Sequence, residues 1–398
     1  MNRKHEAGKA ASPRKNFSEN RMYYEKTADK YHIIQYVPLL FLIVFAVLTV
    51  LFGWRSMLGD NFRYLYKALT LNPVSLDAKY EDISYAAGSG VNFALYKDDL
   101  AVIGEGKVLV YDLAGDMRFR RSAKNTGAAY AVSEKYLAVY TPGSKGLSVY
   151  NSFGSVYEEN LKNPIRIVAV SDSGRIAACL KGEEASEIMV LDKDFSEEAS
   201  FSVGNGVAYD LDFSPNGDRL LITSLATVGG AHYTEISVWD VSSEKLVLTE
   251  KIDGKKPISA GFFDDGRFYA AVQGNIFFYQ ANGKSAGFVS VAASEYAAVC
   301  DGERLAVLRD SQTISLYSKR GDAIADIPLS EKVFSLKCRD GLYYTVSNTR
   351  IAVCDEDGGL LSSYAVDSGL LDFFVLADGS ILLCYVTGTE RVIPSRGV

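Results

Sequence analysis

Histidine is scarce in this sequence, and its scarcity excludes several kinds of chemistry. The chain has 398 residues but only three histidines, and His232 is the only one after residue 32. A serine or cysteine nucleophile needs a nearby base, and zinc sites take most of their ligands from histidine and cysteine. The five cysteines show no C-x-x-C spacing. We therefore expect no catalytic residues, no metal ligands and no cofactor.

Basic residues are not in excess either. The chain has 42 lysines and arginines against 49 aspartates and glutamates, which gives a formal net charge of −7. Proteins that bind nucleic acid present a basic surface to the phosphates. We therefore expect no nucleic-acid partner.

One long apolar run stands near the start of the chain. Residues 33–53 read IIQYVPLLFLIVFAVLTVLFG and carry no charge. At about 1.5 Å per residue, a helix of this length crosses the roughly 30 Å apolar core of a bilayer. The run exceeds the 7–15 residues of a usual signal-peptide core. It predicts an uncleaved single transmembrane helix, with the lipid bilayer as one partner.

The flanking charges predict the orientation of this helix. Residues 1–32 contain eight lysines and arginines against four acids, whereas residues 54–73 contain only three cations. Because cytoplasmic flanks carry the positive excess, the N-terminus should be cytoplasmic and the rest extracytoplasmic. We expect a basic, disordered cytoplasmic tail at 1–32 and a single-pass cell-membrane protein. Residues 54–79 are predicted to form a juxtamembrane helix or linker.

From about residue 80 one unit of roughly 40 residues repeats. Its clearest strand reads VLVYD (108–112), LSVYN (147–151), IMVLD (188–192), ISVWD (236–240), IFFYQ (276–280), ISLYS (314–318) and IAVCD (351–355). A polar turn and an apolar strand precede each of these, as in SPNGDRLLIT from residue 214. Four short strands at this period are typical of a β-propeller blade, and the aspartates in the turns are expected to cap their own backbone.

The number of blades follows from the turns. Eight first turns are visible, but the last unit ends near residue 395 without a fourth strand. Residues 80–86 (YEDISYA) are strand-like and otherwise unpaired. A strand there would complete the last blade and remove an exposed edge. The sequence thus predicts an all-β, eight-bladed propeller over residues 80–398, with seven blades as the alternative.

Residues 207–252 carry a resemblance to a known family. The segment FSPNGDRLL and the pair Trp239–Asp240 are similar to a WD40 blade, whereas the other units match only in period. The whole layout also resembles the uncharacterised, single-pass, membrane-anchored propeller proteins of Gram-positive bacteria. That resemblance implies a location and a shape and assigns no activity.

The longest insertion within a blade is LATVGGAHYTE, residues 225–235. Long, unequal loops on a rigid scaffold are where binding sites concentrate. We select Tyr233, His232, Lys255 and Lys256 as candidate partner-binding residues, because tyrosine is enriched among interface hot spots. The five cysteines fall in or beside strands and are expected to be free, buried thiols; Cys338 and Cys354 are the one pair to check.

These observations favour a non-catalytic envelope protein that binds a protein partner or acts as a sensor. Two alternatives remain at this stage. One is an extracytoplasmic enzyme that acts on glycan or peptide with paired carboxylates on the loop face. The other is storage of a small ligand or metal in the channel of the ring.

Overall fold

The computed structural model describes residues 36–46 and most of residues 82–393. Within the second range it does not describe residues 86–89, 97–98, 105, 123–128, 134, 152–153, 183–184, 204–205 and 293–295. The chain divides into two compact units, Met1–Leu71 and Asn72–Val398. The fold described below is that of the second unit.

In the first unit, residues 36–46 form an α-helix. No helix in the described part of the chain is both long and apolar enough to span a bilayer. The predicted transmembrane segment 33–53 overlaps this helix, but residues 33–35 and 47–53 lie outside the described residues. The predicted cytoplasmic tail (1–32) and juxtamembrane segment (54–79) also lie outside them.

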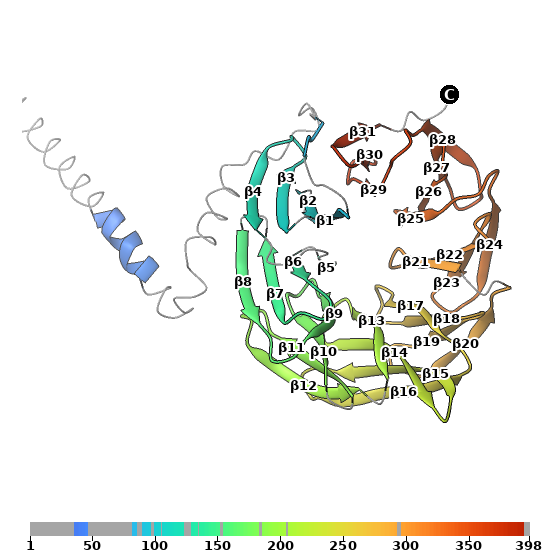
Figure 1. Cartoon of the computed structure of the whole chain (residues 1–398), viewed down its shortest axis with the longest axis horizontal. Helices are drawn as coiled ribbons and strands as arrows, with labels where there is room; N and C mark the ends of the chain where they lie inside the picture. Colours follow the sequence, from blue (N-terminus) through green and yellow to red (C-terminus); the bar gives the residue numbers. More distant parts are fainter. Residues whose placement is uncertain are drawn as a thin grey trace, which may run out of the picture. The chain divides into compact units, whose positions relative to one another are not determined.

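The second unit consists of consecutive antiparallel sheets, which we number as blades one to eight in chain order (Figure 1). The strands of the first four blades are β1 Asn92–Tyr96, β2 Asp99–Gly104, β3 Lys107–Asp112 and β4 Met117–Ser122; β5 Ala129–Val132, β6 Leu137–Tyr140, β7 Gly146–Asn151 and β8 Gly154–Asn160; β9 Ile165–Val170, β10 Ile176–Lys181, β11 Ser186–Leu191 and β12 Glu197–Val203; β13 Val207–Phe213, β14 Arg219–Val228, β15 Ala231–Asp240 and β16 Lys245–Asp253.

Blades five to seven repeat the same order of four strands, and blade eight has three. Their strands are β17 Pro257–Phe262, β18 Phe268–Val272, β19 Asn275–Tyr279 and β20 Ser285–Ser290; β21 Tyr296–Cys300, β22 Arg304–Arg309, β23 Thr313–Ser318 and β24 Ala323–Pro328; β25 Ser335–Arg339, β26 Leu342–Val346, β27 Arg350–Cys354 and β28 Leu360–Ala365; β29 Asp372–Val375, β30 Ile381–Cys384 and β31 Thr389–Val392. The predicted eight-bladed all-β propeller is confirmed, and the seven-bladed alternative is wrong.

The hairpin turns form as the sequence predicts, because aspartate side chains cap the backbone of their own turns. In the turn between β11 and β12, Asp192 Oδ1 accepts hydrogen bonds from the N–H groups of Asp194 (2.8 Å) and Ser196 (2.9 Å). In the turn between β21 and β22, Asp301 Oδ1 accepts one from the N–H of Arg304 at 2.7 Å. These carboxylates accept hydrogen bonds from the backbone of their own turns.

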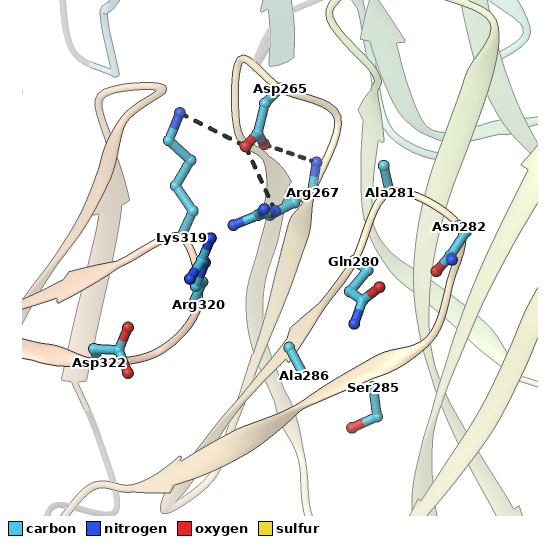
Figure 2. A pocket seen from close by; sticks show the side chains of 10 residues that line it. All are labelled: Asp265, Arg267, Gln280, Ala281, Asn282, Ser285, Ala286, Lys319, Arg320 and Asp322. Carbon is cyan, nitrogen blue, oxygen red and sulfur yellow. Dashed lines mark hydrogen bonds and ion pairs between the residues drawn. The ribbon is translucent and has the colours of Figure 1, made fainter.

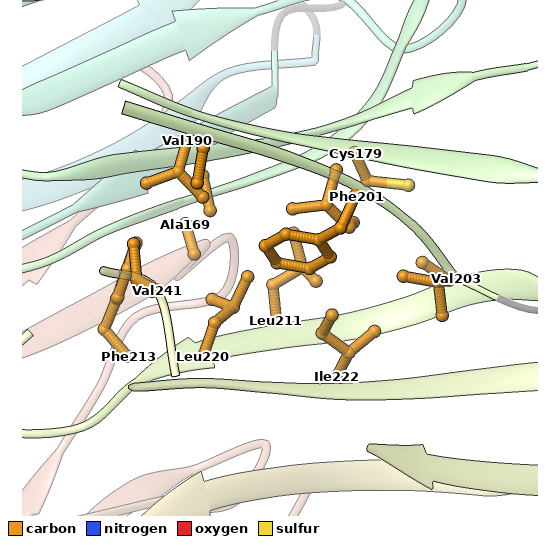
Figure 3. Packing of buried hydrophobic residues seen from close by; sticks show 14 residues of the cluster. Ala169, Cys179, Val190, Phe201, Val203, Leu211, Phe213, Leu220, Ile222 and Val241 are labelled. Carbon is orange, nitrogen blue, oxygen red and sulfur yellow. The ribbon is translucent and has the colours of Figure 1, made fainter. Parts of the chain in front are cut away.

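The hydrophobic core is divided among the interfaces between neighbouring blades. Figure 3 shows the interface of blades three and four, where Phe201 of β12 lies in a cluster of buried residues with Val190 and Leu211. The ring of Trp239 stacks on that of Phe201, with centroids 4.3 Å apart. A single sheet cannot bury both of its faces alone, so each blade depends on the two beside it.

The ring closes through residues 82–85. Ser84 pairs with Gly388 in an antiparallel bridge, and Thr389 donates its backbone N–H to the carbonyl of Ile83 at 2.9 Å. The hydroxyl of Tyr85 lies 2.6 Å from the carbonyl oxygen of Tyr385, to which it donates. Ile83 is buried in a cluster with residues of blades one and eight. Residues 82–85 thus stand where the sequence places the closing strand.

All five cysteines are free thiols, as expected from the sequence, and Cys338 and Cys354 form no disulfide. Cys179, Cys354 and Cys384 are buried, while Cys300 and Cys338 are partly buried. Burial raises the pKa of the Cys300 and Cys338 thiols to about 12. Both remain protonated at neutral pH and therefore act as weak hydrogen-bond donors rather than nucleophiles.

The closure predicts a specific loss of stability. Ile83→Ala should lower the free energy of unfolding by about 2–4 kcal/mol, because it leaves a cavity where the ring closes. Chemical denaturation would measure this loss, and hydrogen exchange should rise in β31 and β1. The matched control is Ile393→Ala, which removes an exposed side chain at the end of β31 and should change stability by less than about 0.5 kcal/mol. Equal effects of the two substitutions would contradict the role of Ile83.

Candidate functional site

Blade four departs from the other blades in the length of its strands. β14 and β15 have 10 residues each and β16 has 9. The pairing of β14 with β15 continues to Val228 and Ala231, and Gly229 and Gly230 make the turn with φ of 58° and 86°. Two successive positive φ angles suit a two-residue hairpin turn, and glycine reaches them at little cost. The segment 225–235 is thus a strand extension, which corrects its interpretation as a long loop.

This correction changes the role of Tyr233. Tyr233 lies within β15, opposite Ala226 of β14 and Asp253 of β16, and only 9% of it is exposed. The ammonium of Lys251 lies 4.9 Å from the centroid of its ring, in a cation–π contact. A buried tyrosine covered by a lysine on the adjacent strand is not an accessible hot spot. Sequence reasoning missed this burial because it interpreted the extra residues as a loop, whereas they continue the pairing of β14 with β15.

The other three predicted residues come together at one end of blade four. Gly254 donates its N–H to the carbonyl of His232 at 2.9 Å. The Oγ1 hydroxyl of Thr234 donates to the carbonyl of Lys255 at 2.8 Å. Lys256 is exposed, whereas His232 and Lys255 are half-buried. The structure therefore places His232, Lys255 and Lys256 at the same end of blade four, where β15 contacts residues 254 and 255 after β16.

The same end of blade four exposes apolar residues that sequence reasoning did not select. Val207 is 49% exposed, Tyr209 54% and Val228 60%. Val207 pairs with Leu225 of β14. Val228 lies three residues further along β14, so about 10 Å of strand separates Val228 from Leu225. The register shifts between Ala208 and Asp210, so Tyr209 is the extra residue of a β-bulge. We call Val207, Tyr209, Val228 and Lys256 the blade-four ridge.

β13 is the inner strand of the same blade and faces the centre of the ring (Figure 1), and it carries two carboxylates. Asp210 Oδ2 accepts a hydrogen bond from the N–H of Ala260 at 3.0 Å, and Asp212 Oδ2 accepts one from the N–H of Phe262 at 2.8 Å. Both N–H groups belong to β17, the inner strand of the next blade. The two aspartates therefore bind backbone groups at the free edge of β17 and join blade four to blade five.

Burial dominates the electrostatics of these aspartates. Desolvation raises the pKa of Asp210, and it raises the pKa of Asp212 to about 7, with a smaller contribution from the neighbouring Asp210 charge. The opposing hydrogen bond from Phe262 favours the ionised form of Asp212 but does not overcome its burial.

A hollow of about 950 Å³ lies between blades five and six, beside their hairpin turns. Its lining is mostly polar and includes Arg267, Lys319 and Arg320 on one side and Gln280 and Asn282 on the other (Figure 2). Within the described part of the chain, no group of three or more histidine, cysteine, aspartate or glutamate side chains is placed to hold a metal ion. Sequence reasoning missed the hollow because its walls come from turns about 55 residues apart.

Residues 77–392 match a family described as "Family of unknown function (DUF5711)". The chain belongs to this family. A search of curated protein sequences finds no match. The matched residues span the propeller. Neither the family description nor the structure tests the predicted resemblance to membrane-anchored proteins of Gram-positive bacteria, so this resemblance stays a prediction.

Solved structures with the same fold are numerous, and they support the WD40-like interpretation. BamB from Moraxella catarrhalis is 10% identical with a TM-score of 0.57, and the match covers 79% of this chain and 100% of that one. The C-terminal WD40 domain of Sif2 is 14% identical with a TM-score of 0.60, covering 80% and 100%. Sqt1 from Chaetomium thermophilum, bound to the N-terminus of the ribosomal protein L10, is 13% identical with a TM-score of 0.57, covering 79% and 99%. The TM-scores show that these proteins and this chain share a fold.

The buried Asp212 predicts an unusual dependence of stability on pH. Its pKa rises from 3.8 in the unfolded chain to about 7 in the fold, so the native state binds more protons between these values. Its contribution to stability therefore falls as pH rises from about 4 to 7. Relative to wild type, Asp212→Asn should gain up to about 2.7 kcal/mol between pH 5 and pH 8, because about two pH units of that range lie below the native pKa. Urea denaturation at a series of pH values would measure the difference.

Asp240 provides a contrasting control for this experiment. Hydrogen bonds from Ser243 lower the pKa of Asp240, so its contribution is present at neutral pH and declines as the pH falls through its native pKa. Asp240→Asn should therefore remove stability at pH 7 rather than add it. A flat difference between wild type and Asp212→Asn from pH 5 to pH 8 would contradict the burial of an uncharged carboxyl at position 212.

Proposed function

We propose that this protein is a non-catalytic binding platform, which holds a protein partner at the blade-four ridge. One observation carries the proposal: exposed apolar side chains of β13 and of the long strand β14 lie at the same end of blade four. Tyr209 and Val228 are more than half exposed, although each extends from a paired strand. Exposed apolar groups on rigid strands bind a partner at low entropic cost because they are already ordered.

The positions of the polar groups agree with this proposal. Lys256 is the exposed polar member of the ridge, and it gives the apolar residues a polar margin of the kind that protein interfaces have. Asp210 and Asp212 are engaged by the backbone of blade five. The glycan or peptide hydrolase considered from the sequence needs two carboxylates facing a cleft. The bonded carboxylates of blade four favour binding over that chemistry.

The fold supports the same class of function by analogy. Propellers present unequal loops on a rigid ring, and the structurally similar Sqt1 has been solved with a segment of another protein bound to it. That likeness lies in the fold and names no partner for this chain. We propose further that the platform works outside the cell, attached to the membrane through residues 33–53, so that its partner is another envelope protein.

Site-specific photo-crosslinking tests the ridge. A benzophenone amino acid at position 228 should produce discrete crosslinked products in living cells, because Val228 is exposed at the tip of the hairpin. The matched control is position 246, where Leu246 is also exposed but lies at the opposite end of blade four. Tyr209→Ser should reduce the yield at position 228 several-fold. Equal yields at both positions, or none at either, would refute the proposed surface.

Surface labelling tests the location. An epitope tag after Val398 should be labelled on intact cells once the wall is made permeable, and a tag before Met1 should be labelled only after lysis. This result follows from the charge excess in residues 1–32. Labelling of both tags only after lysis would contradict the extracytoplasmic location and leave the ridge proposal to its own test.

A further inference from the structure

The outer strand of each blade is an edge, and most of these edges carry charge. An edge strand offers unpaired N–H and C=O groups to any extended chain, and charged or proline residues discourage such pairing. Five of the seven outer strands of the four-stranded blades have them. The residues are Arg118, Arg120 and Arg121 in β4, Glu158 and Glu159 in β8, Glu197 and Glu198 in β12, Lys245, Glu250, Lys251 and Asp253 in β16, and Asp326 and Pro328 in β24.

β20 is an uncharged edge. It reads SAGFVS, and it is the last strand in its sheet, at the periphery of the ring (Figure 1). Five of its six residues are exposed. Phe288 is 61% exposed and contacts Phe277 of β19, with ring centroids 5.5 Å apart. At Gly287 no atom beyond its two chain neighbours lies within 4 Å of where a Cβ would be, so the sheet face at this position is open.

The hollow between blades five and six begins at the first residues of this edge. Ser285 and Ala286 of β20 form part of its lining. Arg320 stands in the opposite wall (Figure 2), and among the described residues it has no ion pair. The neighbouring Asp322 accepts a hydrogen bond from the Ser318 hydroxyl at 3.1 Å, which directs its carboxylate to its own turn.

The other cations of the hollow are already neutralised. Lys319 lies 2.7 Å from Glu303 and 3.7 Å from Asp265, and Arg267 lies 3.5 Å from Asp265. Arg320 is therefore the cation that remains available to an incoming anion. Its guanidinium suits a carboxylate because it can donate two parallel hydrogen bonds.

Chain direction connects the edge with the hollow. β20 runs away from the hollow, from Ser285 to Ser290. A chain that paired with it in the antiparallel sense would run toward the hollow and end there. Six residues of strand span about 20 Å, which a short extended peptide covers. The end that arrives at Arg320 is the C-terminus, which carries a free carboxylate.

We propose that the outer edge of β20 binds the extended C-terminal segment of another protein. The segment pairs antiparallel with β20, an apolar side chain packs beside Phe288, and the terminal carboxylate binds Arg320 in the hollow. Main-chain hydrogen bonds supply affinity in such strand addition, and the side-chain contacts supply selectivity. This surface is separate from the blade-four ridge, and the proposal does not depend on the function assigned to the ridge.

Fluorescence anisotropy with the full-length protein in mild detergent tests this proposal. The probes are two labelled octapeptides of alternating threonine and valine, identical except that one ends in a free carboxylate and the other in an amide. The carboxylate peptide should bind, and the amide should bind about tenfold more weakly. Arg320→Glu should remove most of that difference, and Phe288→Lys should weaken both peptides about tenfold or more. Both positions are exposed, so the fold should survive these changes, which thermal unfolding would check.

β28 offers a matched control, because it is also an uncharged outer strand but does not line the hollow between blades five and six. Ser363→Lys in β28 should leave binding unchanged, whereas Ser290→Lys in β20 should weaken it. Three results would overturn the proposal: no binding of either peptide, equal loss from both lysine variants, or dimers of the protein that Ser290→Lys dissociates. The last result would show that the edge pairs with a second copy of the chain.

Discussion

The propeller depends on the burial of both faces of every sheet against its neighbours. Each blade supplies short apolar strands that would be exposed on one or both faces if the blade stood alone. Eight hydrophobic clusters fill the interfaces, and the cluster around Ile83 joins blade eight to blade one. Because every blade needs a neighbour on each side, the last blade must contact the first. Residues 82–85 make this closing contact with residues about 300 positions later in the sequence.

A second constraint acts at the centre of the ring, where each inner strand has a free edge. Side chains of adjacent blades bind these edges. Asp210 and Asp212 accept from the N–H groups of β17, and the Cys300 thiol donates to the carbonyl of Phe262 in the same strand at 3.8 Å. Lys337 and Arg339 of β25 donate in the same way to carbonyls of β29.

These central contacts give the polar residues of the inner strands a structural role. A carboxylate that caps a neighbouring N–H, or a thiol that donates to a neighbouring carbonyl, joins two blades that share no backbone ladder. Burial at these contacts raises the pKa of Asp212 and of the Cys300 thiol, since both lie where water is excluded. Blades four and five, which these contacts join, also carry the blade-four ridge and the edge of β20.

The repeat determines the local structure of the chain. Residues close together in sequence produce the strands from VLVYD to IAVCD, the aspartate-capped turns and the missing fourth strand of the last unit. The all-β class, the number of blades and the free cysteines were therefore predictable. Of the candidate site, the sequence located the end of blade four through His232, Lys255 and Lys256. Tertiary structure alone decided that Tyr233 is buried under Lys251, that a bulge exposes Tyr209, and that Arg320 faces Ser285 across a hollow. These features depend on register and on contacts between blades, which join residues that are distant in the chain and that no local pattern relates.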